Sequence, residues 1–333
     1  MSSSRRDGGD VAVLGAGIAG LSAATMLVER GLSVRLFDKA RGPAGRISTR
    51  HSGRFDFDHG AQYFTVREDH FQAFVNEMED REVVAEWRGK FVRVDERGQS
   101  LGPARESRRF VGQPGMNALA KYLAKDLDVR TQTRVAVATP EDPTHLHSEQ
   151  GEDLGTFGRV LVTFPAGQAA EWLAQVEPEL AKRVASVAMK PCRALLLGFE
   201  SRVDVPFDGA FVEGSPLSWV ARNSSKPGRP PGEAWVLHGS PEWSEENFDL
   251  DQEEADAAME AAFRELCGSE LPPEAHRDSH RWKYAIPERV LEESFLTSED
   301  GKVTLCGDWC AGPRVEGAWL SGRAAAEHLL TGL

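Results

Sequence analysis

The stretch Val11-Ala-Val-Leu-Gly-Ala-Gly-Ile-Ala-Gly20 decides the fold of this 333-residue chain. Residues 11–14 are apolar and predict a buried strand, and the three glycines that follow have the G-x-G-x-x-G spacing. A helical pattern then covers residues 18–30, and residues 33–37 predict a second strand that leads to Asp38. The order of strand, glycine loop, helix, strand and acid is typical of a dinucleotide-binding βαβ unit.

Each glycine of this unit has a predicted role. Gly15 allows the tight turn, Gly17 lets backbone N–H groups approach a pyrophosphate, and Gly20 lets the helix pack closely on the strand. The helix N-terminus presents unpaired N–H groups and a partial positive charge to the phosphates. Asp38 can accept hydrogen bonds from a ribose diol. Glycine-rich turns also serve as plain connections, but the surrounding elements favour a dinucleotide site and leave FAD or NAD open.

The composition limits the partners of the protein. The formal net charge is −13 and the isoelectric point is near 5.3, so neither nucleic acid nor an anionic membrane is expected as the main partner. The sequence has no run of 18 or more apolar residues, so no membrane span is expected. The length predicts two domains. Residues 1–9 are interpreted as a short disordered leader and not as an export signal.

The cysteines and histidines indicate the cellular setting and the absent chemistries. Four scattered cysteines without a secretion signal predict a reduced, cytoplasmic location. Cys306 and Cys310 form a C-x3-C pair; a thiol redox pair and two packed free thiols both fit, and the second is favoured. No helical H-x3-H motif, metal site, Ser-His-Asp spacing or pair of catalytic carboxylates is expected.

The remaining elements predict a nucleotide-binding sheet interrupted by a second, sheet-and-helix region. The strand pattern at residues 129–135 is expected to rejoin the nucleotide-binding sheet. Residues 223–232 form a polar, proline- and glycine-rich loop, either a lid or a plain connection. The predicted helices are 70–86, 116–127, 167–175 and 251–267, and the other predicted strands are 160–165, 193–200, 210–212, 217–221 and 234–240.

The end of the chain favours FAD over NAD. Residues 303–308 predict a strand ending in Gly307-Asp308, followed by a glycine loop and an alanine-rich helix from Ala318 to Leu330. FAD proteins use this arrangement to hold the ribityl chain and the flavin ring. Asp308 would accept from a hydroxyl group of the ribityl chain or from one close to the phosphates. The first-turn N–H groups around residues 315–318 would stabilise negative charge on a reduced flavin.

Segments along the whole chain resemble those of bacterial renalases, within the amine-oxidase-like flavoproteins. They include the acid at position 38, Gly45-Arg46, Gly60-Ala-Gln-Tyr-Phe-Thr65 and Phe110-Val-Gly-x-Pro-Gly-Met116. Further segments are Trp219-x-Ala-Arg-Asn-x-Ser-Lys-Pro-Gly-Arg229, His280-Arg-Trp282, Cys306-Gly-Asp-Trp-Cys310 and Arg314-Val-Glu-Gly-Ala-Trp319. Pro43-Ala44 departs from the commoner glycine-rich pair without removing a group that the FAD site needs.

This resemblance implies a fold and an activity. The fold would be α/β, with a Rossmann-type FAD-binding domain and an inserted α+β substrate domain, in the topology shared by p-hydroxybenzoate hydroxylase and amine oxidases. The chain would hold FAD noncovalently and take a hydride from 2- and 6-dihydroNAD(P) isomers to give NAD(P)+. O2 would then reoxidise the flavin and yield H2O2. Flavin N5 would accept the hydride, so no catalytic side chain is expected.

The resemblance also implies binding roles for particular residues, beside those argued from the motifs. The expected cofactor-binding residues are Gly15, Gly17, Ile18, Ala19, Gly20, Asp38, Lys39, Arg46, Gln62, Val135 (through its backbone, against adenine), Gly307, Asp308, Val315, Gly317 and Ala318. The expected substrate-binding residues are Tyr63, Phe64, Thr65, Arg67, Cys192, Tyr284 and Trp309.

Several of these positions have simpler interpretations. Arg46 lies in a glycine-rich turn and could cap the pyrophosphate or be solvated, and the first is favoured. Trp309 and Tyr284 could be core residues, and Arg67 could be a solvated arginine at a helix start. The basic residues Arg222, Lys226 and Arg229 could meet substrate phosphates, but a basic surface loop is favoured.

The predicted FAD-binding domain is discontinuous and comprises residues 8–80, 107–165 and 275–333, and the predicted substrate domain comprises residues 81–106 and 166–274. Two other functions remain open. A flavin amine oxidase would frame its flavin with an aromatic pair, and a non-catalytic flavin-binding sensor would use the insert to bind a partner.

Overall fold

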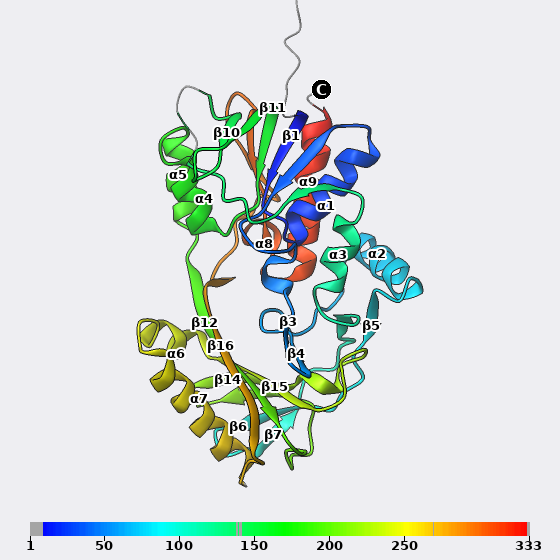
Figure 1. Ribbon diagram of the computed structural model, residues 1–333, viewed down its shortest axis with the longest axis vertical. Helices are drawn as coiled ribbons and strands as arrows, with labels where there is room; N and C mark the ends of the chain where they lie inside the picture. The colour runs from blue at the N-terminus through cyan, green and yellow to red at the C-terminus, as the bar shows by residue number, and fades with distance from the viewer. Residues whose placement is uncertain (1–8, 138, 140–141, 269, 332–333) are drawn as a thin grey trace, which may run out of the picture. The chain divides into compact units, whose positions relative to one another are not determined.

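The computed structural model describes residues 9–137, 139, 142–268 and 270–331 (Figure 1). The predicted leader lies almost entirely outside the described residues. The described part divides into two compact units, of which the first comprises residues up to Arg46, Ala120–Met189 and residues from Ile286 onward. The second comprises Ile47–Leu119 and Lys190–Ala285. Within the described residues, no helix is both long and apolar enough to cross a membrane.

The first unit contains a seven-stranded, mostly parallel sheet with the order β17-β18-β11-β1-β2-β9, and β10 pairs with β11. The predicted βαβ unit is confirmed: β1 (Gly9–Leu14) pairs in parallel with β2 (Val34–Phe37), and α1 (Ile18–Glu29) connects them. The other strands are β9 (Asp128–Arg130), β10 (His145–His147), β11 (Asp153–Val162), β17 (Leu296–Thr297) and β18 (Val303–Leu305).

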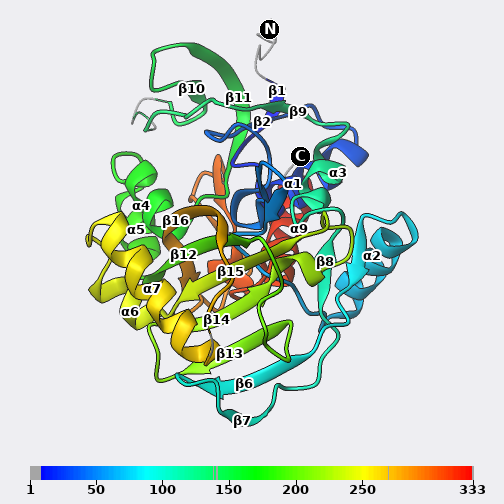
Figure 2. The same cartoon turned by 60° about the horizontal axis from the view of Figure 1, so that its bottom comes forward.

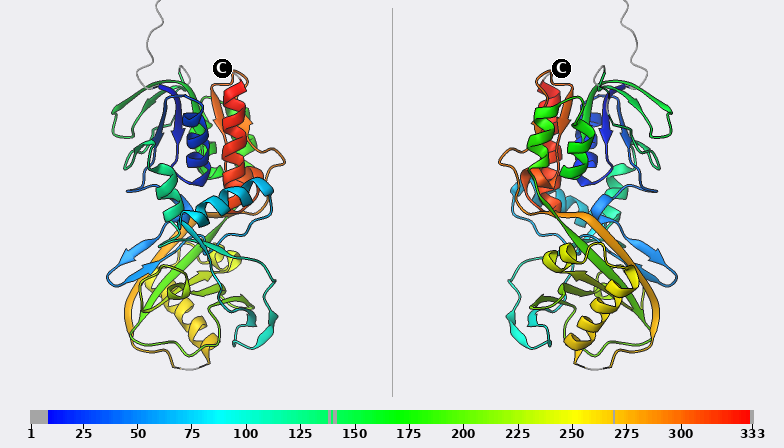
Figure 3. Two further views of the ribbon diagram at one scale, coloured as in Figure 1. Left: turned by 90° about the vertical axis from the view of Figure 1, so that its right-hand side faces the viewer. Right: turned by 90° about the vertical axis from the view of Figure 1, so that its left-hand side faces the viewer.

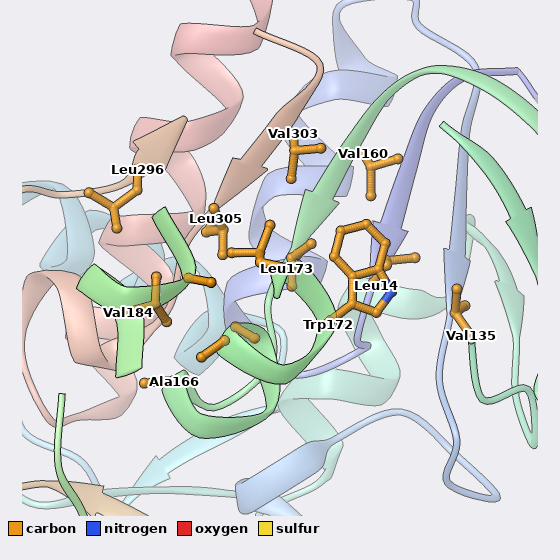
Figure 4. Close-up of a cluster of buried hydrophobic side chains, with 14 of the residues drawn as sticks. Leu14, Val135, Val160, Ala166, Trp172, Leu173, Val184, Leu296, Val303 and Leu305 are labelled. Atoms are coloured by element: carbon orange, nitrogen blue, oxygen red, sulfur yellow. The ribbon is translucent and has the colours of Figure 1, made fainter. Parts of the chain in front are cut away.

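One face of this sheet is covered by a large apolar core (Figure 4). Leu14, Val160 and Leu305 come from three neighbouring strands, and Trp172 and Leu173 come from α4. Such burial is the dominant favourable contribution to folding, at about 25 cal/mol per Å² of apolar surface. The helices of this unit are α1, α4 (Ala166–Leu173), α5 (Pro178–Ala185), α8 (Asp308–Ala311) and α9 (Val315–Thr331), with a 3-10 turn at Gly45–Ile47.

Helix α1 packs directly against α9 (Figure 3). Ser22 on α1 donates its hydroxyl to the carbonyl of Trp319 on α9, at 3.0 Å. Gly322 allows the close approach, because a Cβ there would collide with the backbone carbonyl of Ala19. Helix α1 is buried nearly all round, which explains why its sequence is apolar on every face.

The second unit contains a seven-stranded mixed sheet with the order β16-β12-β15-β14-β13-β6-β7 (Figure 2). Strands β12 to β15 pair in antiparallel fashion, and β13 pairs with β6 in parallel. The strands are β6 (Phe91–Asp95), β7 (Ser100–Pro103), β12 (Met189–Phe199), β13 (Gly209–Glu213), β14 (Leu217–Arg222), β15 (Glu233–Gly239) and β16 (Glu274–Pro287).

Helix α7 packs on this mixed sheet through Met259 and Phe263, which join Trp235 and Leu237 in one apolar cluster. The α/β fold class is therefore confirmed, with a Rossmann-type sheet and a separate mixed sheet. The remaining elements of this region are β3 (Arg50–Ser52), β4 (Phe55–Phe57), α2 (Asp69–Asp80), β5 (Val84–Glu86), β8 (Phe110–Gly112), a 3-10 turn at Asn223–Ser225, α6 (Pro241–Glu246) and α7 (Gln252–Cys267). Helix α3 (Ala118–Ala124) begins in the second unit and continues into the first.

Two predicted helices are markedly shorter in the structure. The predicted helix 70–86 ends at Asp80, because Glu82 adopts a left-handed conformation (φ 58°), and residues 84–86 form β5. The predicted helix 116–127 is shorter, since the N–H groups of Met116 and Asn117 donate to the side chains of Asp58 and Thr49.

Two of the elements that the sequence analysis missed are α5 and β16. Helix α5 follows α4 after a short turn, and β16 is a long strand at one end of the mixed sheet. Much of β16 is polar and exposed, so it lacks the apolar alternation that identifies a half-buried strand.

The compact units also differ in extent from the predicted functional domains. Residues 47–80, 107–119 and 275–285 fall in the second unit, and residues 166–189 fall in the first. Residues 55–57 group with the second unit because Phe55 and Phe57 pack against Ala234 and Val236 of β15. The assignment of cofactor and substrate roles to these parts stays a prediction.

The contact between α1 and α9 can be tested by replacing Gly322 with valine. The added side chain would collide with the carbonyl of Ala19, so we expect the free energy of unfolding to fall by about 1–3 kcal/mol. The control is E327A, at an exposed position of the same helix, which should change it by less than about 0.5 kcal/mol. Urea unfolding measures both, and equal stability of G322V and the parent protein would contradict the close approach.

Candidate functional site: a nucleotide-binding loop and a buried ion cluster

The glycines of the loop between β1 and α1 have different surroundings. Gly15 has φ +113°, and a Cβ there would lie 2.5 Å from Oγ1 of Thr163. A Cβ on Gly20 would collide with the carbonyl of Gly15. A Cβ on Gly17, in contrast, would have no described atom within 4 Å. Gly15 and Gly20 are therefore required by the packing of the chain, and Gly17 borders space that a ligand can use.

The loop also presents backbone donors. Gly17 is the N-cap residue of α1 and has no capping side chain, and its carbonyl accepts from the N–H of Leu21. The N–H groups of Ile18, Ala19 and Gly20 lie in the first turn, where a helix offers donors without helical partners. This arrangement suits a phosphate group.

Asp38 lies directly after β2, beside this loop. Its Oδ2 accepts from the N–H of Ala16 at 2.7 Å, and its Oδ1 accepts from the N–H of Ala40 at 2.8 Å. Both oxygens keep further acceptor capacity, so a ribose diol can still bind. Burial lowers the pKa of the adjacent Lys39, and the charge of Arg134 lowers it further.

The structure brings together Arg46 and Asp308, which the sequence analysis treated separately. The guanidinium of Arg46 donates two hydrogen bonds to the carboxylate of Asp308, at 2.8 and 2.5 Å. This bidentate, charge-assisted pair joins the glycine-rich turn after β2 to the start of α8. The pair fixes the direction of the Arg46 side chain and of the Asp308 carboxylate, which is predicted to accept from the ribityl chain.

Val135 and the start of α9 supply further backbone groups. The N–H of Ala136 donates to His147, and the carbonyl of Arg134 accepts from Glu149. These bonds flank Val135, so its own N–H and C=O point away from Ser148, the residue opposite it in the bridge. Both groups can therefore bind adenine, as the prediction requires. The predicted cofactor-binding residues of α9 lie in its first turn. Val315 is its first residue, and the N–H of Ala318 donates to the carbonyl of Arg314. A Cβ on Gly317 would collide with the carbonyl of Gly312.

The second unit contains a buried ion cluster that the sequence analysis did not predict. Asp58 is fully buried, and its Oδ2 accepts from Nζ of Lys226 at 3.0 Å and from the guanidinium of Arg229 at 2.6 Å. Its Oδ1 accepts from the hydroxyl of Thr49 and from the N–H of Met116. Burial by itself would raise the pKa of Asp58, but the two cations outweigh burial and hold this pKa well below its usual range.

The favoured interpretation of the basic loop was therefore wrong. Lys226 and Arg229 are buried against Asp58, and Arg222 is buried and donates to Glu233 at 2.6 Å. The preference for a surface loop failed because the balancing acid is far away in the sequence. Burial lowers the pKa of Lys226 to about 8, although the charge of Asp58 opposes this shift.

The cluster fixes Gln62, a predicted cofactor-binding residue of the second unit. Its Nε2 donates to the carbonyls of Asp58 and Gly60, and its Oε1 accepts from Nζ of Lys226 at 3.2 Å. Because both amide protons are used, Gln62 can offer another group only the remaining acceptor capacity of its oxygen.

The predicted substrate-binding residues are divided between the two units. Tyr63 packs against Trp219, with ring centroids 5.5 Å apart, and the guanidinium of Arg109 lies over its ring. Phe64 is buried and exchanges two backbone hydrogen bonds with Phe110. The other residues of the second unit are Thr65 and Tyr284, both half-buried, Arg67, which is exposed, and Cys192, whose pKa burial raises to about 12.

Trp309 lies in the first unit and is completely buried in its apolar core. Its indole N–H donates to the carbonyl of Phe164 at 3.0 Å. These contacts give Trp309 a packing role, and its action on substrate stays a prediction. Cys306 and Cys310, in the same region, are buried free thiols, as the favoured interpretation predicted.

Two histidines of the second unit, His59 and His238, are neutral at neutral pH. Burial, with the charges of His280 and Arg50, lowers the pKa of His59 to about 4. Burial also lowers the pKa of His238 to about 4. The carbonyl of His59 accepts from the indole of Trp282 at 2.9 Å.

Comparison with known proteins defines the class. The family model for flavin-containing amine oxidoreductases matches residues 85–330, and that for an NAD(P)-binding Rossmann-like domain matches residues 13–78. The chain belongs to the flavin-containing amine oxidoreductase family. It is thus a flavin-containing oxidoreductase.

Solved structures share the fold over the full chain. A proposed protoporphyrinogen oxidase from Exiguobacterium sp. 255-15 aligns over 100% of both chains, with a TM-score of 0.78 and 13% identity. Two variants of putrescine oxidase align over 98% of this chain and 99% of theirs, with TM-scores of 0.73 and 0.72 and 14% identity. At these identities the similarity concerns the fold.

The described residues of the first unit fit a flavin dinucleotide. Gly17 borders open space, α1 directs its free N–H groups there, and Asp38 stands beside them. The Arg46–Asp308 pair lies at the start of α8, shortly after β18. The donors and acceptors match the phosphate, ribose and hydroxyl groups of such a ligand.

The replacement G17V should abolish cofactor binding while leaving the fold intact. A Cβ at Gly17 would meet no described atom within 4 Å, so we expect the valine side chain to occupy the space in front of α1 without disturbing the chain. Flavin absorbance of the purified protein measures the loss, and circular dichroism measures the fold. The control A73V places the same valine side chain at an exposed position of α2 and should keep the cofactor. A G17V protein with full flavin content would contradict this placement.

The replacement D58N should destabilise the protein by about 3–5 kcal/mol, since it leaves two buried cations without their acid. The control D56N removes an acid paired with the exposed His51 and should cost at most about 1 kcal/mol. Urea unfolding at pH 7 compares them.

The pH dependence of the D58N effect follows from the lowered pKa of Asp58. A carboxyl whose folded-state pKa is lowered contributes stability that is complete above its unfolded value, about 3.9, and decreases as the pH falls toward the folded value. The stability difference between the parent protein and D58N should therefore shrink below about pH 4. A difference that is constant down to pH 2.5 would show that the charge of Asp58 is unimportant.

Proposed function

We propose that the chain is an oxidase of dihydropyridines, specifically of 2- and 6-dihydroNAD(P), and that its flavin is noncovalently held FAD. The overall change is dihydroNAD(P) + O2 + H+ → NAD(P)+ + H2O2. The bound flavin would accept the hydride and its electrons would pass to O2. The ordered similarity of many segments to bacterial renalases supports this substrate class. Four free cysteines support a cytoplasmic location.

The chain would act chiefly by binding and orienting. The first-turn N–H groups after Gly17 would bind the pyrophosphate, and Asp38 would bind the ribose of the adenosine half. Asp308, held by Arg46, would bind a hydroxyl of the ribityl chain. The backbone of Val135 would contact adenine. Alignment of donor and acceptor can provide much of the rate enhancement in such a transfer.

The pairing of two buried acids, Asp58 and Glu233, with cations is the observation that carries the proposal. In the described part of the second unit, Asp58 is balanced by Lys226 and Arg229, and Glu233 is balanced by Arg222. These carboxylates are therefore poor candidates for removing a proton from substrate. Hydride transfer from a dihydropyridine needs no such base, so this chemistry suits the side chains.

Amine oxidation is the second candidate, since the matching family model is that of amine oxidoreductases. Putrescine oxidase, whose variants share the fold, acts on an amine as its name states. An amine must lose a proton before or during its oxidation. His59 and His238 are neutral at pH 7 and could accept that proton.

The decisive experiment is anaerobic mixing of the purified flavoprotein with 2- and 6-dihydroNAD(P). We expect both isomers to bleach the oxidised flavin band, whereas putrescine and benzylamine leave it unchanged. Admission of air should restore the band and release one H2O2 per NAD(P)+ formed. The matched control is ordinary NAD(P)H, the 4-dihydro form, purified from the other two isomers. It should reduce the flavin far more slowly.

Each result has a defined meaning. Bleaching by amines alone would replace the proposal with amine oxidation. A flavin that none of the dihydronicotinamide isomers reduces would overturn the substrate class. The G17V protein, which lacks cofactor, should give no signal with any compound and shows that reduction requires the bound flavin.

A further inference from the structure

Among the described residues, His145, His147 and Asp153 form a group with the chemistry of a metal site. Each offers one ligand atom, and these atoms all lie within 4.8 Å of one another. The residues belong to the hairpin of β10 and β11, in the first unit. The group is separate from the nucleotide-binding loop and plays no part in the proposed oxidation.

The strand geometry explains why these three side chains meet. His145 and His147 are two positions apart on β10, so both side chains leave the same face, while Leu146 between them is buried in the core. Asp153 on β11 pairs with His147 across the hairpin. A register irregularity follows Leu146, and the left-handed Gly155 accommodates it on β11.

The distances fit coordination by one ion. Nε2 of His145 lies 3.0 Å from Oδ1 of Asp153, and the two imidazole rings have centroids 4.5 Å apart. Two ligands of a tetrahedral zinc ion lie about 3.3 Å apart, given metal–ligand bonds of about 2.0–2.2 Å. Since all three side chains are at least partly exposed, small rotations can close the remaining distance.

The carboxylate is held in place by its neighbours. Oδ1 of Asp153 accepts from the N–H of Gly155 at 2.9 Å. Such a hydrogen bond orients a metal-binding carboxylate and is a common feature of metal sites. A carboxylate that is already oriented beside two imidazoles loses less conformational freedom when an ion binds.

We propose that His145, His147 and Asp153 bind a divalent transition-metal ion of the Zn²⁺ type. Two imidazoles and one carboxylate favour Zn²⁺, Ni²⁺ or Cu²⁺ over Mg²⁺ and Ca²⁺, which take oxygen ligands. Water completes the coordination on the exposed side. The ion bridges β10 and β11 and stabilises this hairpin. Ser148, the residue that follows β10, pairs with Val135.

The test is titration of the tag-free, flavin-loaded protein with Zn²⁺ after treatment with a chelator, followed by calorimetry. We expect one ion per chain. H145A, H147A and D153N should each weaken binding by at least about tenfold, because even loss of a residue that only orients a ligand costs about 10–100-fold. H51A is the matched control, since His51 also pairs with an aspartate but has no second imidazole in its group.

Two further measurements separate this site from the cysteines. Co²⁺ bound to His145, His147 and Asp153 should give visible absorption without the near-ultraviolet band of a thiolate ligand. Zn²⁺ should also raise the melting temperature of the parent protein and H51A but not that of H147A. Flavin content, expected to be unchanged, shows that the variants are folded.

Three outcomes would overturn the proposal. The first is an absence of Zn²⁺ binding by the parent protein. The second is equal binding by the parent protein, H145A and H147A. The third is a thiolate band with Co²⁺, which would place the ion on cysteine. The three side chains would then form an ordinary surface pair of histidine and aspartate beside a second histidine.

Discussion

The close approach of backbone to backbone around α1 is the constraint on which the nucleotide-binding part of the structure depends. Gly20 brings α1 against the turn after β1, and Gly322 brings α9 against the opposite side of the same helix. Ser22 links the two helices through the carbonyl of Trp319. Helix α1 is therefore fixed between a strand and another helix, and its N-terminus, with the free N–H groups after Gly17, cannot shift without disturbing both.

Opposite charges are balanced locally in both compact units. The net charge of −13 gives no indication of the local charge at these sites. Acids and bases from distant segments of the chain meet in the Arg46–Asp308 pair and in the Asp58 cluster. Buried ion pairs are weak contributors to net stability, yet loss of one partner is costly. Such pairs are thus better at fixing a conformation than at stabilising the fold. Here they fix the turn at Arg46 and the segment from Asp58 to Gln62.

The sequence predicted those parts of the fold that local patterns determine. The βαβ unit, the strand ending at Asp308 and the final helix all have apolar periodicity and glycines at required positions. Strand β16 was missed because its exposed position in the sheet permits polar residues, and the end of α2 was misplaced because Glu82 adopts a left-handed conformation. Neither feature leaves a clear trace in composition.

Parts of the sites were missed in the sequence analysis because the sequence does not show which residues meet in space. The partners either lie far apart along the chain or lie on two paired strands. Lys226 and Arg229 looked like surface residues, since Asp58, their partner, lies more than 160 positions earlier. His145 and His147 were overlooked because a helical H-x3-H spacing was sought, whereas a strand brings alternate residues to one face. A search for H-x-H beside a turn and an acid would have found the group.

The Asp58 cluster also changes how the predicted role of Gln62 can be realised. The resemblance assigned Gln62 to the cofactor, but its amide is held by two backbone carbonyls and by Lys226. A side chain held at three points acts as a fixed part of the wall rather than as an adaptable donor. The cluster thus determines the path of residues 58–62 and the direction in which Tyr63 leaves the backbone. Asp58, Lys226 and Arg229 would therefore affect any chemistry at Tyr63 through position alone, without contact with the reacting atoms.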